Sequence, residues 1–459
     1  MITTLAALAL ALAPQAATRP PNIVLIVADD LGWGELGCYG QERIRTPRID
    51  QLAREGLRFT QFYAGAPVCA PSRCTLMTGL HTGHAYVRDN REVQPEGQAP
   101  IPDATVTLAE LLRDAGYATG GFGKWGLGAP GSEGAPERQG FERFFGYNCQ
   151  REAWSFYPDH LWDNERRVEL EGNARGRSGA QYSHDVICEA AREFVRANRE
   201  RPFFLYVPST IPHLALQVPN DSLAEYVGLW EDPPYVGGKG YLPHPAPRAA
   251  YAAMVTRLDR EVGRLVDLVD ELGLTDDTLF LFTSDNGPTY DRIGGSDSDF
   301  FESSGPLRGR KGSVLEGGLR VPLVVRWCGH VASGTESDLP SAFWDLLPTL
   351  AELAGARLPG GLDGISFAPT LLGRGEQALH DHLYWEFRDY GGQQAIRLGD
   401  WKGVRLGMAQ GSRAIELYDL AADPGESTDL AAEHPAVVAR IEELMATGGT
   451  PSELFPLAW

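Results

Sequence analysis

Three features are scarce in this chain: cysteine, positive charge, and apolar runs long enough to cross a membrane. The six cysteines of the 459 residues are spaced neither as a zinc site nor as a dense disulfide framework. The 41 lysines and arginines face 61 aspartates and glutamates, a net charge of −20. Because nucleic-acid phosphates would be repelled, we expect no nucleic-acid partner. An anionic substrate would need a local cluster of basic side chains.

The apolar run at residues 5–13 is too short for a membrane span, which takes about 20 residues. Pro14 and small residues suited to cleavage follow it, although no lysine or arginine precedes it. The run therefore predicts a signal peptide over residues 1–17 and a secreted or periplasmic protein. A structural N-terminal helix is the alternative. We expect no membrane span elsewhere in the chain.

The middle of the chain alternates apolar runs with segments of helical pattern. The runs suit strands that are buried on both faces of a parallel sheet, and they lie at 21–28, 57–63, 117–123, 202–208, 278–283 and 321–327. The predicted helices lie at 46–55, 107–115, 184–197 and 248–272. This alternation predicts an α/β fold with a mostly parallel central sheet sandwiched by helices. Residues 126–182 lack sustained periodicity and predict a long, partly ordered excursion.

The pattern changes after about residue 373. Short alternating segments separated by turns lie at 383–387, 394–397, 401–405 and 416–418, and a helix is predicted at 435–445. These segments predict an antiparallel sheet with the helix packed on it. We therefore expect a catalytic domain over residues 20–372 and a smaller C-terminal subdomain over residues 373–459.

Two acidic clusters, Asp29-Asp30 and Asp285-Asn286, each follow an apolar run. In open α/β sheets, sites form at the carboxyl ends of strands. Paired carboxylates repel unless a counter-ion lies between them, and oxygen ligands suit a hard divalent cation. Calcium is favoured over zinc because no histidine or thiolate pattern accompanies the clusters. Turn formation is the structural alternative for either cluster.

Cys69 precedes Pro71-Ser72-Arg73, which predicts a helix beginning at Pro71. The free N–H groups of that helix would point toward Cys69 and would favour an anion beside its side chain. A packed thiol before a short helix is the alternative. Further cationic candidates near predicted strand ends are Lys124, His213 and Lys311.

The segment from Cys69 to Gly79 matches the sulfatase pattern C-x-P-S-R-x-x-x-x-T-G without a mismatch, and the chain resembles that family from Pro21 to roughly Leu430. The resemblance implies an alkaline-phosphatase-like fold. It also implies that a formylglycine-generating maturase oxidises Cys69 to formylglycine, whose hydrated aldehyde is the nucleophile. The implied metal ligands are Asp29, Asp30, the oxidised Cys69, Asp285 and Asn286. The implied catalytic and sulfate-binding residues are Arg73, Lys124, His213 and Lys311, with His213 as general acid for the departing alcohol.

One position departs from the pattern. Many sulfatases have Lys-Trp-His after the strand, whereas this chain has Lys124-Trp125-Gly126. The group that takes the proton when sulfate leaves is therefore open. The candidate replacements are His81, His84 and His160.

Residues 140–150, 157–162 and 285–320 are similar to a carbohydrate-sulfatase subgroup that acts on galactose-type sugars, including N-acetylgalactosamine. The implied function is release of inorganic sulfate from a sulfated sugar. Trp154, Tyr157, Trp162, Asp297 and Arg388 are the predicted sugar contacts, with core packing as the alternative for the aromatic residues. An arylsulfatase, a phosphonate monoester hydrolase and an inactive sulfated-glycan-binding protein remain alternatives.

Overall fold

The computed structural model describes residues 19–290 and 292–457. The predicted signal peptide at residues 1–17 lies outside this part of the chain. Across residues 19–290 and 292–457, no helix has the length and apolar character needed to cross a membrane.

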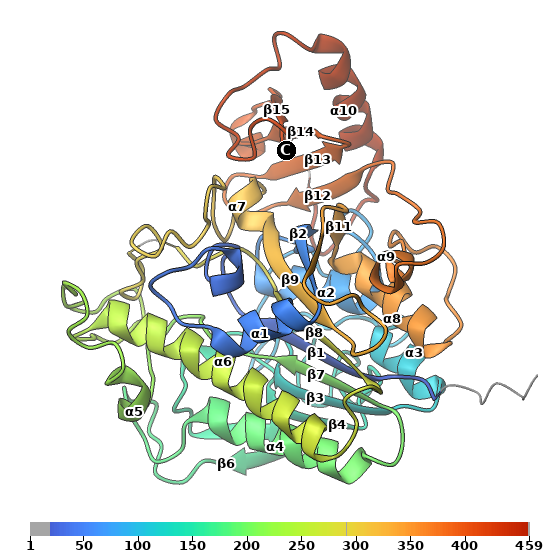
Figure 1. The fold of residues 1–459 in the computed structure, drawn as a ribbon. Coiled ribbons are helices and arrows are strands. Elements are labelled where there is room, and N and C mark those ends of the chain that lie inside the picture. Colours follow the sequence, from blue (N-terminus) through green and yellow to red (C-terminus); the bar gives the residue numbers. More distant parts are fainter. Residues whose placement is uncertain (1–18, 291, 458–459) are drawn as a thin grey trace, which may run out of the picture.

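Eleven strands form the main sheet (Figure 1). They are β1 (Asn22–Ala28), β2 (Leu57–Tyr63), β3 (Ala118–Lys124), β4 (Arg143–Tyr147), β5 (His160–Asp163), β6 (Arg166–Glu169), β7 (Phe203–Pro208), β8 (Thr278–Ser284), β9 (Arg320–Arg326), β10 (Thr335–Ser337) and β11 (Ser341–Ala342). Their order is β10-β2-β9-β8-β1-β7-β3-β4-β5-β6, with β11 paired to β2. The four central strands β8, β1, β7 and β3 run parallel, so their carboxyl ends share one edge of the sheet.

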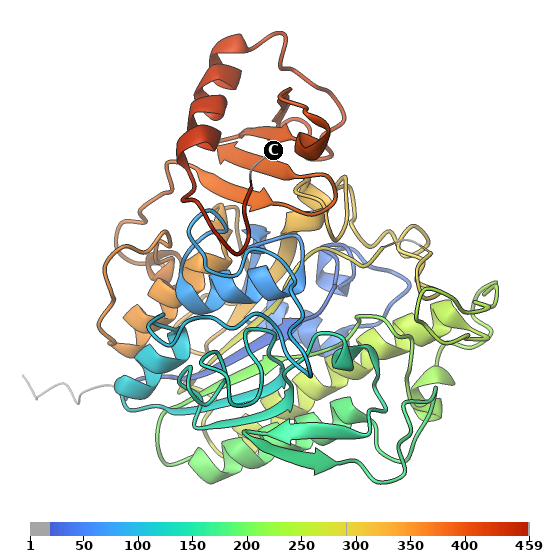
Figure 2. The same ribbon diagram turned by 180° about the vertical axis from the view of Figure 1, so that it is seen from behind.

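Helices cover both faces of this sheet, as the two opposite views show (Figures 1 and 2). One face packs against α1 (Pro47–Glu55), α4 (Ser183–Asn198) and α6 (Pro247–Glu271). The other face packs against α2 (Cys69–Thr78), α3 (Leu108–Asp114), α8 (Leu346–Ala354) and α9 (Ala368–Leu372). Short helical segments lie in the connections: α5 (Asn220–Leu223), α7 (Glu316–Leu319), and the 3-10 turns at Gly37–Tyr39, Glu152–Trp154, Phe343–Asp345 and Met408–Gln410. The predicted sheet sandwiched by helices is confirmed.

A separate four-stranded antiparallel sheet follows, as predicted. Its strands, in order, are β12 (Leu383–Phe387), β13 (Gln393–Leu398), β14 (Trp401–Arg405) and β15 (Glu416–Asp419). Helix α10 (Pro435–Thr447) covers one face, where Ile441 and Leu444 pack in one apolar cluster with Ile396 and Leu417.

Two predictions about local structure were wrong. The segment 126–182 was expected to be a long, partly ordered excursion over the top of the domain, but its strands β4, β5 and β6 extend one side of the main sheet. These strands are four or five residues long, and β6 is largely exposed, so they give no continuous apolar run. Helix α2 begins at Cys69 rather than at Pro71, because extended Val68 takes the N-cap position. Cys69 therefore lies in the first turn of the helix.

A buried cluster of charged side chains joins the small sheet to the main body. Lys402 Nζ of β14 lies 2.8 Å from Glu316 Oε1 and 2.9 Å from Glu426 Oε1, and all three side chains are fully buried. Arg320 Nη2 lies 2.5 Å from the second oxygen of Glu316. Burial alone would raise the pKa of Glu316, but Arg320 and Lys402 lower it to about 2. The carboxylate therefore stays charged inside the protein.

Candidate active site

The predicted site residues meet at the carboxyl ends of the central strands. This follows from the parallel arrangement of four neighbouring strands, each of which ends in, or is soon followed by, a polar residue. Asp29 and Asp30 follow β1, Asp285 and Asn286 follow β8, Lys124 ends β3, and His213 lies five residues after β7. Cys69 and Arg73 reach the same edge from α2.

Each buried carboxylate of this group contacts a cation. Lys124 Nζ donates a 2.6 Å hydrogen bond to Asp29 Oδ2, and Lys311 Nζ donates a 2.9 Å bond to Asp30 Oδ2. Arg73 donates two bonds to Asp285 Oδ2, at 3.1 and 2.7 Å. These pairs orient the carboxylates. They also form the local cluster of basic side chains that an anionic substrate would need in a chain with a net charge of −20.

The carboxylates also affect one another. Burial and repulsion from Asp29 raise the pKa of Asp285 to about 7, and Arg73 offsets only part of that rise. Burial alone would raise the pKa of Asp29, but Lys124, His213 and Arg73 hold it well below its usual range. Another positive charge between the carboxylates would favour the ionised form of both.

The donor set fits a hard divalent cation. Asn286 Nδ2 donates to Asp30 Oδ1 at 2.8 Å, whereas the buried Asn286 Oδ1 has no hydrogen-bond partner among the described residues. Ligand atoms of Asp29, Asp30, Cys69 and His213 lie within 4.8 Å of one another. Clustered carboxylate oxygens and a free amide oxygen are the ligands that calcium takes.

Cys69 lies beside this cluster as a buried thiol. Its Sγ is 3.4 Å from Asp29 Oδ1 and 3.6 Å from Lys311 Nζ. Burial and the Asp29 charge raise the pKa of the thiol to about 12. The thiol therefore stays protonated at neutral pH and is a poor nucleophile in its unmodified form. None of the six cysteines, which all lie in the described ranges, forms a disulfide.

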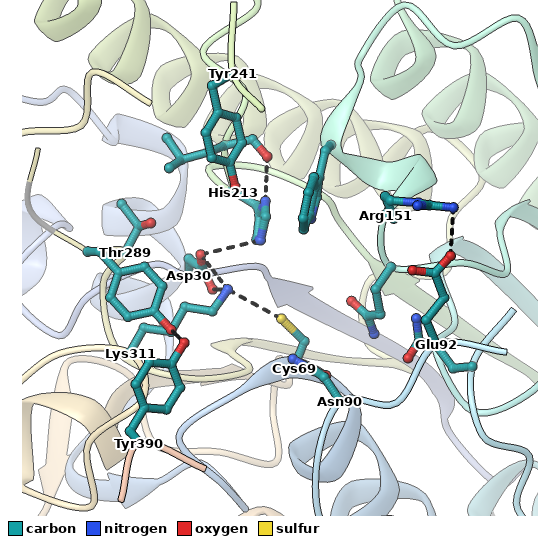
Figure 3. A pocket seen from close by; sticks show the side chains of 15 residues that line it. Asp30, Cys69, Asn90, Glu92, Arg151, His213, Tyr241, Thr289, Lys311 and Tyr390 are labelled. Atoms are coloured by element: carbon teal, nitrogen blue, oxygen red, sulfur yellow. Dashed lines mark hydrogen bonds and ion pairs between the residues drawn. The ribbon is translucent and has the colours of Figure 1, made fainter. Parts of the chain in front are cut away.

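A cavity opens above these residues (Figure 3). Asp30, Cys69, His213 and Lys311 line it together with two pairs of aromatic side chains. The ring centroids lie 5.8 Å apart in the pair Trp154–Tyr241 and 6.0 Å apart in the pair Tyr290–Tyr390. The cavity thus combines cationic groups beside the cysteine with apolar ring surfaces.

His213 places one ring nitrogen near the carboxylates and the other on the backbone. Nε2 lies 3.7 Å from Asp30 Oδ2, and Nδ1 faces the Leu214 carbonyl. Burial and the nearby Lys311 charge lower the pKa of His213 to about 4. The imidazole is therefore neutral at pH 7, although the Asp30 and Asp29 carboxylates raise its pKa in part.

A protein-family model described as Sulfatase matches residues 21–356. The chain belongs to the sulfatase family. A second model, described as the C-terminal part of N-sulphoglucosamine sulphohydrolase, matches residues 310–447 of the sulfatase. The second match starts inside the main body and runs through the small antiparallel sheet.

Characterised relatives cover most of the sulfatase. Arylsulfatase A of Homo sapiens is 36% identical, over 94% of this chain and 88% of its own length. An N-acetylgalactosamine-6-O-sulfatase of Bacteroides thetaiotaomicron is 31% identical, over 93% of each chain. Among solved structures, Ps i-CgsB in complex with k-i-k-neocarrahexaose has a TM-score of 0.78 at 28% identity and covers 94% of this chain and 93% of its own. These matches confirm the predicted family and class of enzyme, a sulfuric ester hydrolase.

Four of the five predicted sugar contacts do not line the cavity of the sulfatase. Asp297 Oδ2 accepts bonds of 2.8 and 2.6 Å from Arg248, and neither Asp297 nor Arg388 lines the cavity. Trp154 does line it, whereas Tyr157 packs in the apolar core. Trp162 donates from its indole to Glu96 at 2.7 Å. Of the five predicted contacts, the structure places only Trp154 on the wall.

The three histidines considered as replacements for the missing imidazole also lie elsewhere. Nδ1 of His84 lies 2.9 Å from Asp363, against which His81 also packs, and His160 lies between Asp159 and Glu96. None of the three lines the cavity that holds Cys69.

Several cavity residues were not predicted as site residues. They are Asn90, Glu92, Gln98, Gln150, Arg151, Leu214, Tyr241, Thr289, Tyr290 and Tyr390. They come from loops that the sequence pattern does not place in space, so no local signal identifies them. Only their position in the fold brings them to the cysteine.

Proposed function

We propose that this sulfatase releases inorganic sulfate from a sulfated carbohydrate of the galactose or N-acetylgalactosamine type. The observation that carries the proposal is one cavity in which Cys69 and Lys311 lie beside Trp154 and Tyr241. Lysine binds the anion, and aromatic faces suit the apolar face of a sugar ring. The N-acetylgalactosamine-6-O-sulfatase of Bacteroides thetaiotaomicron supports this substrate class, because it matches over 93% of both chains.

We propose that a maturase converts Cys69 to formylglycine and that Asp29, Asp30, residue 69, Asp285 and Asn286 bind calcium. Bound there, the cation would act as a Lewis acid on a sulfate oxygen, and the hydrated formylglycine would supply the nucleophilic oxygen. The side chain of residue 69 would keep its place at the start of α2, between Asp29 and Lys311. Arg73 is a positioning residue, because its guanidinium holds Asp285 from inside the protein.

We also propose roles for the other charged residues, and their positions support these roles. Lys124 and Lys311 offset the negative charge of the sulfate group, and both stay protonated because nearby carboxylates raise their pKa despite burial. His213 is neutral in the free protein, and a bound anion would raise its pKa. We propose that the imidazole then protonates the departing alcohol oxygen of the sugar.

The proposal includes an exported protein, with residues 1–17 as its leader. It also divides the chain into a catalytic domain at 20–372 and a subdomain at 373–459. The separate antiparallel sheet supports this division, although the buried contacts of Lys402 tie the two parts together.

A panel of esters tests the substrate class. We expect kcat/KM to be at least about tenfold higher for one sulfated hexose than for 4-nitrophenyl sulfate. This aryl ester has no hydroxyl groups to form hydrogen bonds with the polar side chains that line the cavity, such as Gln98 and Gln150. Phosphonate monoesters serve as the third arm, since a phosphonate monoester hydrolase shares the fold with a TM-score of 0.66. Sulfate release from aryl esters alone, or cleavage of phosphonates alone, would refute the carbohydrate assignment.

Calcium is expected to stabilise the matured protein. Because the ion would take up the Asn286 oxygen and separate the buried carboxylates, calcium at a hundred times its Kd should add about 2.7 kcal/mol to the free energy of unfolding. Thermal unfolding after chelation, with and without added calcium, measures this shift. The Asn286→Leu variant should lose most of it. An equal shift with sodium chloride of the same ionic strength would contradict a specific site.

A further inference from the structure

Gln150 lines the cavity beside Cys69, yet its side chain has no partner in the described part of the protein. The residue is 7% exposed, and neither Oε1 nor Nε2 forms a hydrogen bond. A buried carboxamide normally has both its donor and its acceptor satisfied. The unsatisfied donor and acceptor of Gln150 therefore indicate that a group of a bound ligand forms hydrogen bonds with them.

The backbone fixes this carboxamide close to the catalytic strand ends. Strand β4 pairs in parallel with β3, with Tyr147 opposite Lys124, and Trp125 N donates to Tyr147 O at 2.8 Å. The chain then passes from Tyr147 to Gln150 alongside the segment that follows Lys124.

Gly126 makes the room that the carboxamide occupies. Its φ is +86°, and a Cβ built on it would lie only 2.1 Å from Gln150 Nε2. Any other residue at position 126 would displace the amide group. Gly126, which stands where the Lys-Trp-His pattern has histidine, therefore leaves the space in which the Gln150 amide group lies.

The chemistry of the carboxamide selects the group that it binds. A sulfate oxygen only accepts hydrogen bonds, so it could satisfy Nε2 but not Oε1. A hydroxyl group both donates and accepts, so it can satisfy both atoms. We propose that Gln150 is a specificity-determining residue that binds a sugar hydroxyl near the sulfate ester. This inference rests on the proposed carbohydrate sulfatase activity.

The same wall carries more polar groups that face the cavity. Gln98 Oε1 is a second buried atom without a partner, and Arg151 lies 2.7 Å from Glu92. Figure 3 shows Glu92 and Arg151 on one side of the cavity and Tyr390 on the other. Polar side chains on one side of the cavity and the Tyr390 ring on the other suit a polyol ring with two unlike faces.

The test compares Gln150→Met with the wild type on three kinds of ester. These are the best sulfated hexose of the panel, its deoxy analogues that each lack one hydroxyl, and 4-nitrophenyl sulfate. We expect the wild type to lose at least about tenfold in kcat/KM on one deoxy analogue, since the carboxamide is then left unpaired. Gln150→Met should lose a similar factor on the parent sugar, should no longer distinguish that analogue, and should keep its rate on the aryl ester.

Gly126→Ala gives the same test without removing the carboxamide. The added methyl group would push the flexible end of Gln150 aside, so the same loss of discrimination is expected. Gln139→Met is the matched control. Gln139 is also buried, with a partnerless Oε1, but it does not line the cavity, so this variant should keep the wild-type preference.

The outcomes separate this inference from the proposed function. Failure of the wild type to release sulfate from any ester would refute the function itself. An equal loss by Gln150→Met on the sugar and on the aryl ester would mean that Gln150 contacts the sulfate or only supports the fold, and would refute the hydroxyl contact. Retention of every deoxy discrimination in Gln150→Met would refute it as well.

Discussion

Replacing Cys69 with alanine is expected to lower kcat for sulfate release by a factor on the order of 10³ or more. The side chain at this position lies between Asp29 and Lys311, and a methyl group there offers no nucleophilic atom. In the proposed mechanism Lys124 and Lys311 would still bind the anion, so KM should change far less than kcat. Steady-state sulfate release over a range of substrate concentrations separates the two effects.

Cys74→Ala is the matched control for this change. Cys74 is also a buried thiol of α2, but it packs in the apolar core away from the cavity. Its loss should cost some stability and leave kcat within about twofold of the wild type. Mass spectrometry of the peptide that contains Cys69 should show the loss that accompanies conversion of a thiol to an aldehyde. Full activity with an unmodified cysteine, or in the alanine variant, would refute the nucleophile.

The strands that hold the site were predictable because they are buried on both faces. Strands were predicted at residues 21–28 and 278–283 from their apolar runs, and β1 and β8 are found there with almost the same bounds. The strands β4 to β6 gave no such signal, because they are short and lie at one side of the sheet. The order of strands, which brings Asp29 next to Asp285, is a property of topology that the separate runs do not carry.

Contacts at the site between residues far apart in the sequence could not be predicted from the sequence. Asp297 was predicted to bind sugar, and this stays a prediction. The structure adds its ion pair with Arg248, of which the sequence gives no sign. Gln150 was not predicted as a site residue, because an unpaired carboxamide is recognised only when its surroundings are known. The glycine at 126 was noticed as a gap in the family pattern, whereas its effect on Gln150 required the fold.

The buried charges of Glu316, Lys402 and Glu426 were likewise missing from the sequence interpretation. Charged residues are mostly exposed, and a single sequence does not show that three of them meet inside the protein. Each comes from a different part of the chain, and the contact exists only because the small sheet docks beside α7.

Replacing Lys402 with methionine is expected to lower the free energy of unfolding by about 3–5 kcal/mol. The change leaves the carboxylates of Glu316 and Glu426 buried together without the cation between them. Urea unfolding followed by tryptophan fluorescence measures the loss. Adding Glu426→Gln should recover part of it, because the substitution removes one of the two buried negative charges. Arg440→Ala, which breaks an exposed pair with Glu443, should cost less than about 1 kcal/mol.

Lys402→Met should also weaken binding of calcium at the proposed site, because the cluster of Glu316, Lys402 and Glu426 supports the segment that carries Asn286. Glu316 opens α7, and Gly318 O at its other end accepts a 3.0 Å bond from Gly287 N, directly after Asn286. The packing there is tight, since a Cβ on Gly287 would lie 1.9 Å from Gly317 O. A shift of α7 would therefore move Asn286. We expect the calcium-dependent rise in unfolding temperature to shrink in Lys402→Met and to persist in Arg440→Ala. A wild-type calcium response in a destabilised Lys402→Met protein would show that the cluster holds the small sheet alone.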